Sequence, residues 1–214
     1  MTHAQIEDQE QIVRKFKIAS LNMPVRQVYF YSNDTNQELV AYPGRLGSDF
    51  TYRGNPEMTI YKLSKDTAGT EVRIPVGKFV FKGQASEWIL FINKDRTGDN
   101  YSIIGYPNTS NLADRGGQFD FINLSSKPVI GIFGDQKIAI EMGERSTLKK
   151  NQIKLAKNKS ATQIQFAFRT QDDWKRFYTN IWPVDENRAS TIVFYNKPGT
   201  DSVELNWISE MLNN

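Results

Sequence analysis

The feature that most constrains the fold is the recurrence of short runs of Val, Ile, Phe and Tyr between turn residues. Several runs alternate apolar and polar residues, as 163–168 (QIQFAF) does, and alternation with period two indicates a strand with one buried face. The runs lie at 27–32, 38–42, 49–52, 58–63, 72–76, 78–81, 88–93, 101–106, 119–124, 129–133, 137–140, 163–168, 191–196 and 202–207. Many short strands at this spacing predict an all-β fold of antiparallel sandwiches or barrels.

Four of these runs end alike, which indicates an internal duplication. They read FYSN at 30–33, FINK at 91–94, FINL at 121–124 and FYNK at 194–197. We expect two antiparallel β-sandwich-like units, of about the 100 residues typical of an immunoglobulin-size sandwich. The expected ranges are an N-terminal arm at 1–23, unit 1 at 24–112 and unit 2 at 117–214. The alternative is that Phe-x-Asn only marks a buried strand that enters a turn, where Asn is favoured.

Two segments have helical spacing. Residues 4–18 place Ile12, Val13 and Phe16 near one face, after a polar start. Residues 170–178 (TQDDWKRFY) are a better match, because Thr and Asp stand at capping-box spacing and the aromatic residues fall on one side. The sequence therefore predicts one short helix near 170–178 in the second unit.

The residue types needed for most catalysis are scarce. The chain has no cysteine and one histidine, His3, so a Cys–His pair and a thiolate or multi-imidazole zinc site are excluded. Asp172 and Asp173 point about 100° apart on a helix, which is poor geometry for a shared site. Ser146 and Lys149 match Ser-x-x-Lys, a pattern expected about once by chance in this composition. We therefore expect that the chain is not an enzyme and that it has no catalytic residue, cofactor or metal. The alternative is an enzyme that uses carboxylate or Lys/Tyr chemistry.

Charge and hydropathy place few limits on the partner. The net charge is +3, from 27 basic and 24 acidic residues, and no apolar stretch approaches the roughly 20 residues that span a membrane. Residues 1–11 are polar and do not match a signal peptide. The absence of cysteine fits a cytosolic protein and also an exported protein without disulfides.

A run of basic residues is the first candidate binding feature. Between 145 and 171 there are seven basic residues and no acidic one. The five lysines of the candidate site are Lys149, Lys150, Lys154, Lys157 and Lys159. Such a run suits phosphates, acidic polysaccharide or an anionic surface, whereas the alternative is a solvated loop and sheet edge. Nucleic acid is disfavoured, because 153–157 contains no aromatic residue for base stacking.

Tryptophan is the second candidate. Trp88 and Trp174 are expected in the core, and Trp182, in the sequence NIWP at 180–183, is the best candidate for an exposed sugar-stacking platform. The alternative for Trp182 is packing, which is the commoner use of a large aromatic side chain.

The region from 119 to 144 resembles a pattern in bacterial exported proteins of unknown function. In that pattern a strand with an Asn-containing turn, here 119–125 and 127–129, precedes a short strand, here 137–140, and a glycine turn, here 142–144. The runs 88–94 and 191–199 are similar to later repeats of the pattern. The resemblance implies a paired β-sandwich and a cell-envelope location, and it implies no activity and no functional residue.

These observations lead to one main hypothesis and two alternatives. The main hypothesis is a non-catalytic periplasmic or extracellular protein that binds or scaffolds, with a polysaccharide or another envelope protein as partner. The alternatives are a carbohydrate-binding module, through an aromatic platform or the basic run, and an enzyme. A cytoplasmic location is the alternative to export.

Overall fold

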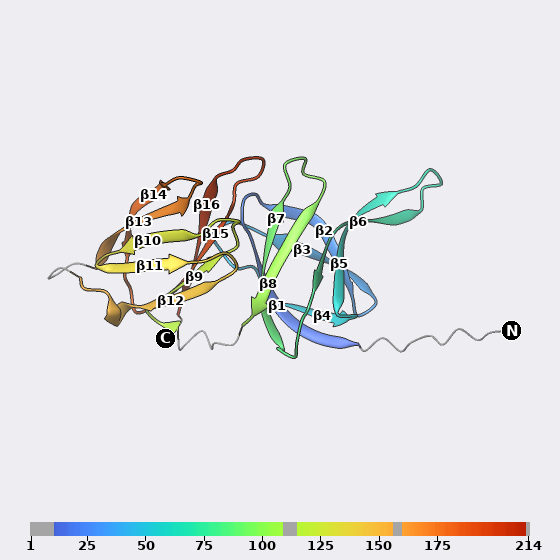
Figure 1. Ribbon diagram of the computed structural model, residues 1–214. Coiled ribbons are helices and arrows are strands. Elements are labelled where there is room, and N and C mark those ends of the chain that lie inside the picture. Colours follow the sequence, from blue (N-terminus) through green and yellow to red (C-terminus); the bar gives the residue numbers. More distant parts are fainter. Residues whose placement is uncertain (1–10, 109–114, 156–159, 213–214) are drawn as a thin grey trace. The chain divides into compact units, whose positions relative to one another are not determined.

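The computed structural model describes residues 11–108, 115–155 and 160–212. These residues are all-β, with sixteen strands in four four-stranded sheets and a 3-10 turn after β12, and the strands form two similar halves, β1–β8 and β9–β16 (Figure 1). The predicted fold class, with two sandwich-like units, is confirmed. In the described chain no helix is long and apolar enough to span a membrane.

The strands of the first half are β1 (Ile12–Ser20), β2 (Val25–Ser32), β3 (Thr35–Ala41), β4 (Phe50–Gly54), β5 (Glu57–Lys65), β6 (Glu71–Val80), β7 (Glu87–Lys94) and β8 (Tyr101–Pro107). Those of the second half are β9 (Gln118–Asn123), β10 (Val129–Phe133), β11 (Gln136–Ile140), β12 (Arg145–Lys149), β13 (Ala161–Arg169), β14 (Trp174–Pro183), β15 (Arg188–Asn196) and β16 (Val203–Met211). The 3-10 turn η2 is Lys150–Gln152.

The two halves have the same topology. The first half has the sheets β4-β1-β7-β8 and β3-β2-β5-β6, and the second has β12-β9-β15-β16 and β11-β10-β13-β14. The pairs β1–β7 and β9–β15 are parallel, and every other pair is antiparallel. Adding eight to each strand number of the first half therefore gives its equivalent in the second.

Each half buries its own aromatic core. The first core includes Phe16, Phe30 and Trp88, and the second includes Phe166, Trp182 and residues of both sheets of that half. Grouped by contacts, the described chain forms two compact units, one of residues up to 42 and from 47 to 108, the other of residues 43–46 and from 115 onward. Burial of apolar side chains between two sheets is the main stabilising contribution in such a fold.

The registers of the two halves match down to a β-bulge. The bulge interrupts β5–β6 after Ile60 and β13–β14 after Phe166, and each leaves one extra residue on the second strand. That residue is Val76 in the first half and Phe177 in the second, and both pack against their cores. A bulge at the same place shows that the correspondence holds residue by residue along these two pairs of strands.

A change of side-chain size distinguishes the two cores at this bulge. Across β2-β5-β6 the residues in register are Phe30, Ile60 and Gly77, and the equivalent row in β10-β13-β14 is Gly131, Phe166 and Tyr178. The phenylalanine of this row stands on β2 in the first half and on β13 in the second, while the glycine stands on β6 in the first half and on β10 in the second. A Cβ at Gly131 would lie 2.3 Å from Cδ1 of Phe166.

Gly131→Ala is therefore expected to destabilise the protein by about 1–3 kcal/mol through overpacking, because Phe166 is held by surrounding rings. The same substitution in a Phe166→Ile background, which copies Ile60 of the first half, is expected to cost clearly less. Urea unfolding of the four variants of this cycle measures the coupling. Equal costs in both backgrounds would contradict the compensation.

Two predicted segments are wrong, because they are strands. Residues 12–18, expected in an N-terminal arm with helical spacing, belong to β1, which lies between β4 and β7 in a sheet; residues 4–10 lie outside the described chain. The helix predicted at 170–178 is the hairpin turn before β14 and the start of that strand.

Thr170 and Asp173, which have capping-box spacing, stabilise the hairpin turn before β14 and not the start of a helix. The Thr170 hydroxyl donates to the carbonyl oxygen of Asp173 at 2.7 Å, and it accepts from the Asp173 amide at 3.0 Å. The bulge then turns both Phe177 and Tyr178 toward the core, which imitates helical spacing in the sequence. Trp174 lies instead beside Arg169, whose guanidinium carbon is 5.4 Å from the ring centroid.

Candidate ligand-binding grooves

Trp182 is not an exposed platform. It is 1% exposed, and it stacks on Trp207 with ring centroids 4.7 Å apart. Its indole nitrogen donates to the hydroxyl of Tyr178 at 3.1 Å. The prediction that Trp182 is exposed is therefore wrong, because alternation along β14 turns this residue toward the second core.

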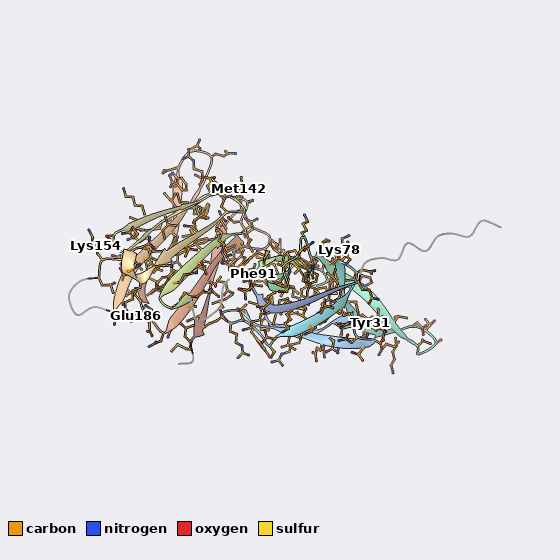
Figure 2. The ribbon with its side chains drawn as sticks, turned by 90° about the horizontal axis from the view of Figure 1, so that it is seen from below. Tyr31, Lys78, Phe91, Met142, Lys154 and Glu186 are labelled. Atoms are coloured by element: carbon orange, nitrogen blue, oxygen red, sulfur yellow. The ribbon has the colours of Figure 1, made fainter. Side chains whose placement is uncertain are left out.

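Two of the three described lysines of the basic run stand beside acidic residues. Lys150 Nζ lies 2.7 Å from Glu186 Oε1, and the backbone amide of Lys154 donates to Asp135 Oδ1 at 3.0 Å. That amide holds the pKa of Asp135 below its usual range. Lys154 and Glu186 are labelled in Figure 2. Lys149 is exposed at the end of β12. Lys157 and Lys159 lie outside the described residues.

The outer face of the sheet β3-β2-β5-β6 carries a cluster of tyrosines around one arginine. The guanidinium carbon of Arg73 lies 4.2 Å from the centroid of the Tyr31 ring and 5.1 Å from that of Tyr61. Tyr29 stacks against Tyr61 with centroids 6.5 Å apart. Tyr31 is 42% exposed, and its position on the outside of its half is labelled in Figure 2.

Asn36 holds this cluster in place. Its side-chain oxygen accepts from the Tyr61 hydroxyl at 2.7 Å and from Arg73 Nη2 at 2.8 Å, while its amide nitrogen donates to Glu71 at 3.3 Å. Burial raises the pKa of Tyr61, an effect that the Arg73 guanidinium opposes and that Tyr31 and Glu71 reinforce. The Tyr61 hydroxyl is therefore protonated at neutral pH and is the donor to Asn36.

Beside the cluster lies an open groove of about 680 Å³, which we name the tyrosine groove. It is lined by Gln11, Tyr31, Asn33, Asp34, Tyr52, Arg53, Gly54, Asn55, Glu57, Thr59, Tyr61, Arg73 and Pro75. The described residues of the lining include two acidic and two basic side chains, so their charges balance. The Tyr52 hydroxyl donates to the carbonyl oxygen of Asn55 at 2.8 Å and fixes one wall. Tyrosine rings combined with amide, hydroxyl and charged groups suit a ligand that has both apolar faces and hydroxyls.

The second half has a groove of about 540 Å³ on the sheet β11-β10-β13-β14, which we name the isoleucine groove. It is lined by Ile130, Gly131, Ile132, Lys137, Ile138, Ala139, Gln165, Phe166, Ala167 and Arg176. Ile132 is 47% exposed. Among the residues that the structure describes, its charged residues are Lys137 on β11 and Arg176 on β14, and none of the lining residues is acidic.

The two grooves overlap at equivalent positions of the two halves, although the tyrosine groove extends further, onto β4. In the first half, Tyr29 is in register with Glu38 and Tyr61, and in the second Ile130 is in register with Ala139 and Ala167. The registers therefore give equivalent positions in the two halves. These equivalences are Tyr29 with Ile130, Tyr31 with Ile132, Asn36 with Lys137, Tyr61 with Ala167, and Pro75 with Arg176. The same place on the fold is therefore polar and aromatic in one half and apolar with basic edges in the other.

A buried charged network lies on β9 of the second half. Asp120 is fully buried, and its oxygens accept from Gln118 at 2.9 Å and from the Thr147 hydroxyl at 2.7 Å. Arg115 Nη2 lies 3.1 Å from Asp120 and donates to the Thr191 hydroxyl at 2.9 Å. Two further ion pairs, Arg115–Glu210 and Arg145–Asp120, join the same network. Nε of Arg115 is buried without a hydrogen-bond partner among the described residues, but both oxygens of Asp120 accept hydrogen bonds from groups inside the protein, so we assign this network to stability.

The part of the chain that the structure describes holds no group of three or more His, Cys, Asp or Glu side chains placed to bind a metal ion. The search of protein-family models found no match to this sequence, and the search of curated proteins also found none. The function is therefore inferred from the grooves themselves.

The sequence contains a signal for the tyrosine groove, although this signal lies in the alternation of a strand and not in a motif. Tyr29 and Tyr31 alternate with Val28 and Phe30, so period two places both tyrosines on the face opposite the core. Arg73 lies on a strand more than forty residues away, and only the sheet order brings it to this face.

Proposed function

We propose that this chain is a non-catalytic binding module and that its tyrosine groove binds a neutral oligosaccharide. The observation that carries the proposal is the Tyr31–Arg73–Tyr61 cluster, held by Asn36 on the outside of a sheet. A sugar presents an apolar face of C–H groups, which packs on an aromatic ring, and hydroxyls, which bond to polar side chains. The balanced charge of the lining favours a neutral ligand over an acidic one.

Tyr31→Ala is expected to weaken oligosaccharide binding at least tenfold, because it removes the exposed ring of the cluster. A glycan array identifies the ligand, and isothermal titration calorimetry at low and high salt measures the affinity. We expect affinity that salt hardly changes, since exposed charge pairs weaken with ionic strength and ring stacking does not.

The matched control is Ile132→Ala, which truncates the equivalent residue of the other half, with a similar exposed fraction. It is expected to leave oligosaccharide binding unchanged. Equal losses in both variants, or no glycan bound by the wild-type protein, would count against the tyrosine groove as the site.

A second candidate function is hydrolysis of the bound glycan, because Asp34 and Glu57 come from different strands or turns and line one groove. Glycosidases use such a pair of carboxyl groups. The Glu57 carboxylate, however, forms an ion pair with Lys78, which does not line the groove; the distance from Oε2 of Glu57 to Nζ of Lys78 is 3.0 Å. We therefore favour binding, and release of reducing sugar from the oligosaccharide, lost in Glu57→Gln, would favour the enzyme instead.

The proposed location is the bacterial cell envelope or the extracellular space. What supports this location is the resemblance of residues 119–144 to exported proteins, together with a proposed ligand that is abundant at cell surfaces. Fractionation of the source cells with an antibody against the chain tests it.

A further inference from the structure

We propose that the isoleucine groove of the second half binds a single apolar chain that carries an anionic head group, such as a fatty-acid carboxylate. This site is separate from the tyrosine groove, and the inference stands whether or not the glycan proposal holds.

The lining of the groove fits an apolar chain. Ile130 and Ile132 stand side by side on β10, and the short side chains of Ala139 and Ala167 flank them on β11 and β13. Short residues between larger ones leave the hollow of about 540 Å³, which is within the usual range for a small-molecule site. Ile132 is nearly half exposed without a ligand, so covering it removes apolar surface from water.

The charged residues at the edges of the groove indicate the charge of the ligand's head group. Lys137 is in register with Ile132 on one side, and Arg176 is in register with Ala167 on the other. Both are exposed and basic, and no acidic residue of the described chain lines the groove. An anionic head at either end of the chain would therefore meet a cation, whereas a cationic head would be repelled.

The same charges argue against a second copy of this face as the occupant. Two such faces laid together would bring two basic edges against two basic edges, which is unfavourable across an interface. The groove also lies over the central strands β10 and β13, so an added strand at a sheet edge would not fill it.

The first half provides the substitution that tests the site. The residue equivalent to Ala167 is Tyr61, so Ala167→Tyr places in the groove a side chain that the same fold carries there in the first half. Tyrosine is favoured on the surface of a strand, and Ala167 lies on the outer face, so the variant is expected to fold.

The experiment is calorimetric titration of the full chain with laurate, kept below its micelle concentration. Dodecyltrimethylammonium supplies the same chain with the opposite charge, and butyrate supplies the head group with a short chain. We expect laurate to bind at least tenfold more tightly than dodecyltrimethylammonium, and we expect no measurable binding of butyrate.

The variants then locate the site. Ala167→Tyr is expected to weaken laurate binding at least tenfold, and the double variant Lys137→Glu/Arg176→Glu to reverse the preference between the two head groups. Tyr31→Ala is expected to leave laurate binding unchanged, which separates this site from the glycan site. Thermal unfolding of each variant confirms that it is folded.

Three kinds of result would overturn the proposal. The first is equal affinity for both head groups or laurate binding unchanged in Ala167→Tyr, since either means adsorption elsewhere. The second is sedimentation with phosphatidylglycerol vesicles without binding of monomeric laurate, which would assign the face to a membrane surface. The third is a dimer in sedimentation velocity that Ala167→Tyr dissociates, which would assign the face to a second copy.

Discussion

Trp182→Ala is expected to destabilise the second half by about 3–5 kcal/mol, the usual cost of removing a large aromatic side chain from a core. The Trp182 ring is 1% exposed and contacts the rings of Phe133, Phe166, Tyr178 and Trp207. The truncation leaves a cavity among rings that already pack at the sheet interface and also removes the hydrogen bond to Tyr178. The free energy of unfolding of a typical domain is only about 5–15 kcal/mol, so this loss is a large fraction of the total stability.

Chemical unfolding followed by circular dichroism measures this effect, with Trp174→Ala as the control. Trp174 is half-buried on the outer face beside Arg169, so its truncation is expected to cost about 1 kcal/mol or less. Similar costs for the two tryptophans would contradict the assignment of Trp182 to the core. A fully stable Trp182→Ala variant that had lost a ligand would restore Trp182 as a platform.

Asp120→Ala is expected to destabilise the second half by about 3–5 kcal/mol, because it removes one partner of a buried ion pair. The Arg115 side chain is 5% exposed and would keep only Glu210, at 3.4 Å, as a carboxylate partner. Gln118 and Thr147 would also lose their shared acceptor. The cost is expected to change little with salt, since buried pairs are poorly screened.

The double variant Arg115→Met/Asp120→Leu is the informative comparison. Replacing a whole buried pair with apolar residues is often neutral, so the double variant is expected to cost clearly less than the sum of the single variants. Urea unfolding of the wild type, both single variants and the double variant measures this coupling. A cost of Asp120→Ala below about 1 kcal/mol would mean that the network is open to water.

Most strands could be predicted because their apolar and polar residues alternate, and the misses have local causes. Strand β12 (Arg145–Lys149) was not predicted, because Leu148 is the one buried residue in it. The start of strand β14, residues 174–178, was predicted as part of a helix, because a bulge at Phe177 breaks the alternation and a hairpin turn uses a Thr–Asp pair at capping-box spacing. Local patterns do not distinguish these cases without the neighbouring strand.

The duplication was predicted from a match that is out of register by one residue. Phe91 was aligned with Phe194, but the strand pairing places Ile92, not Phe91, at the position equivalent to Phe194. Ile92 and Phe194 both belong to their cores, while Phe91 points to the other face of its sheet. A shift of one residue reverses the faces of a strand, so the match indicated the correct pair of strands with the wrong residues aligned.

The candidate site was harder to predict than the fold. The basic run and Trp182 stood out as residue types, but burial removes Trp182 from the surface and acidic neighbours accompany Lys150 and Lys154. The tyrosine groove collects residues from β2, β4, β5 and β6, which only the arrangement of the strands in the two sheets brings together. Side chains of ordinary strands therefore form the site, without any local motif.

The most direct test of the glycan site is a nuclear magnetic resonance titration of the full chain with the oligosaccharide that the array identifies. We expect shifts in the side-chain amide of Asn36, the Nε–H of Arg73 and the backbone amides around Tyr31, with the resonances of the isoleucine groove unchanged. Shifts confined to residues of the second half, or no shifts at saturating sugar, would contradict a glycan site in the tyrosine groove.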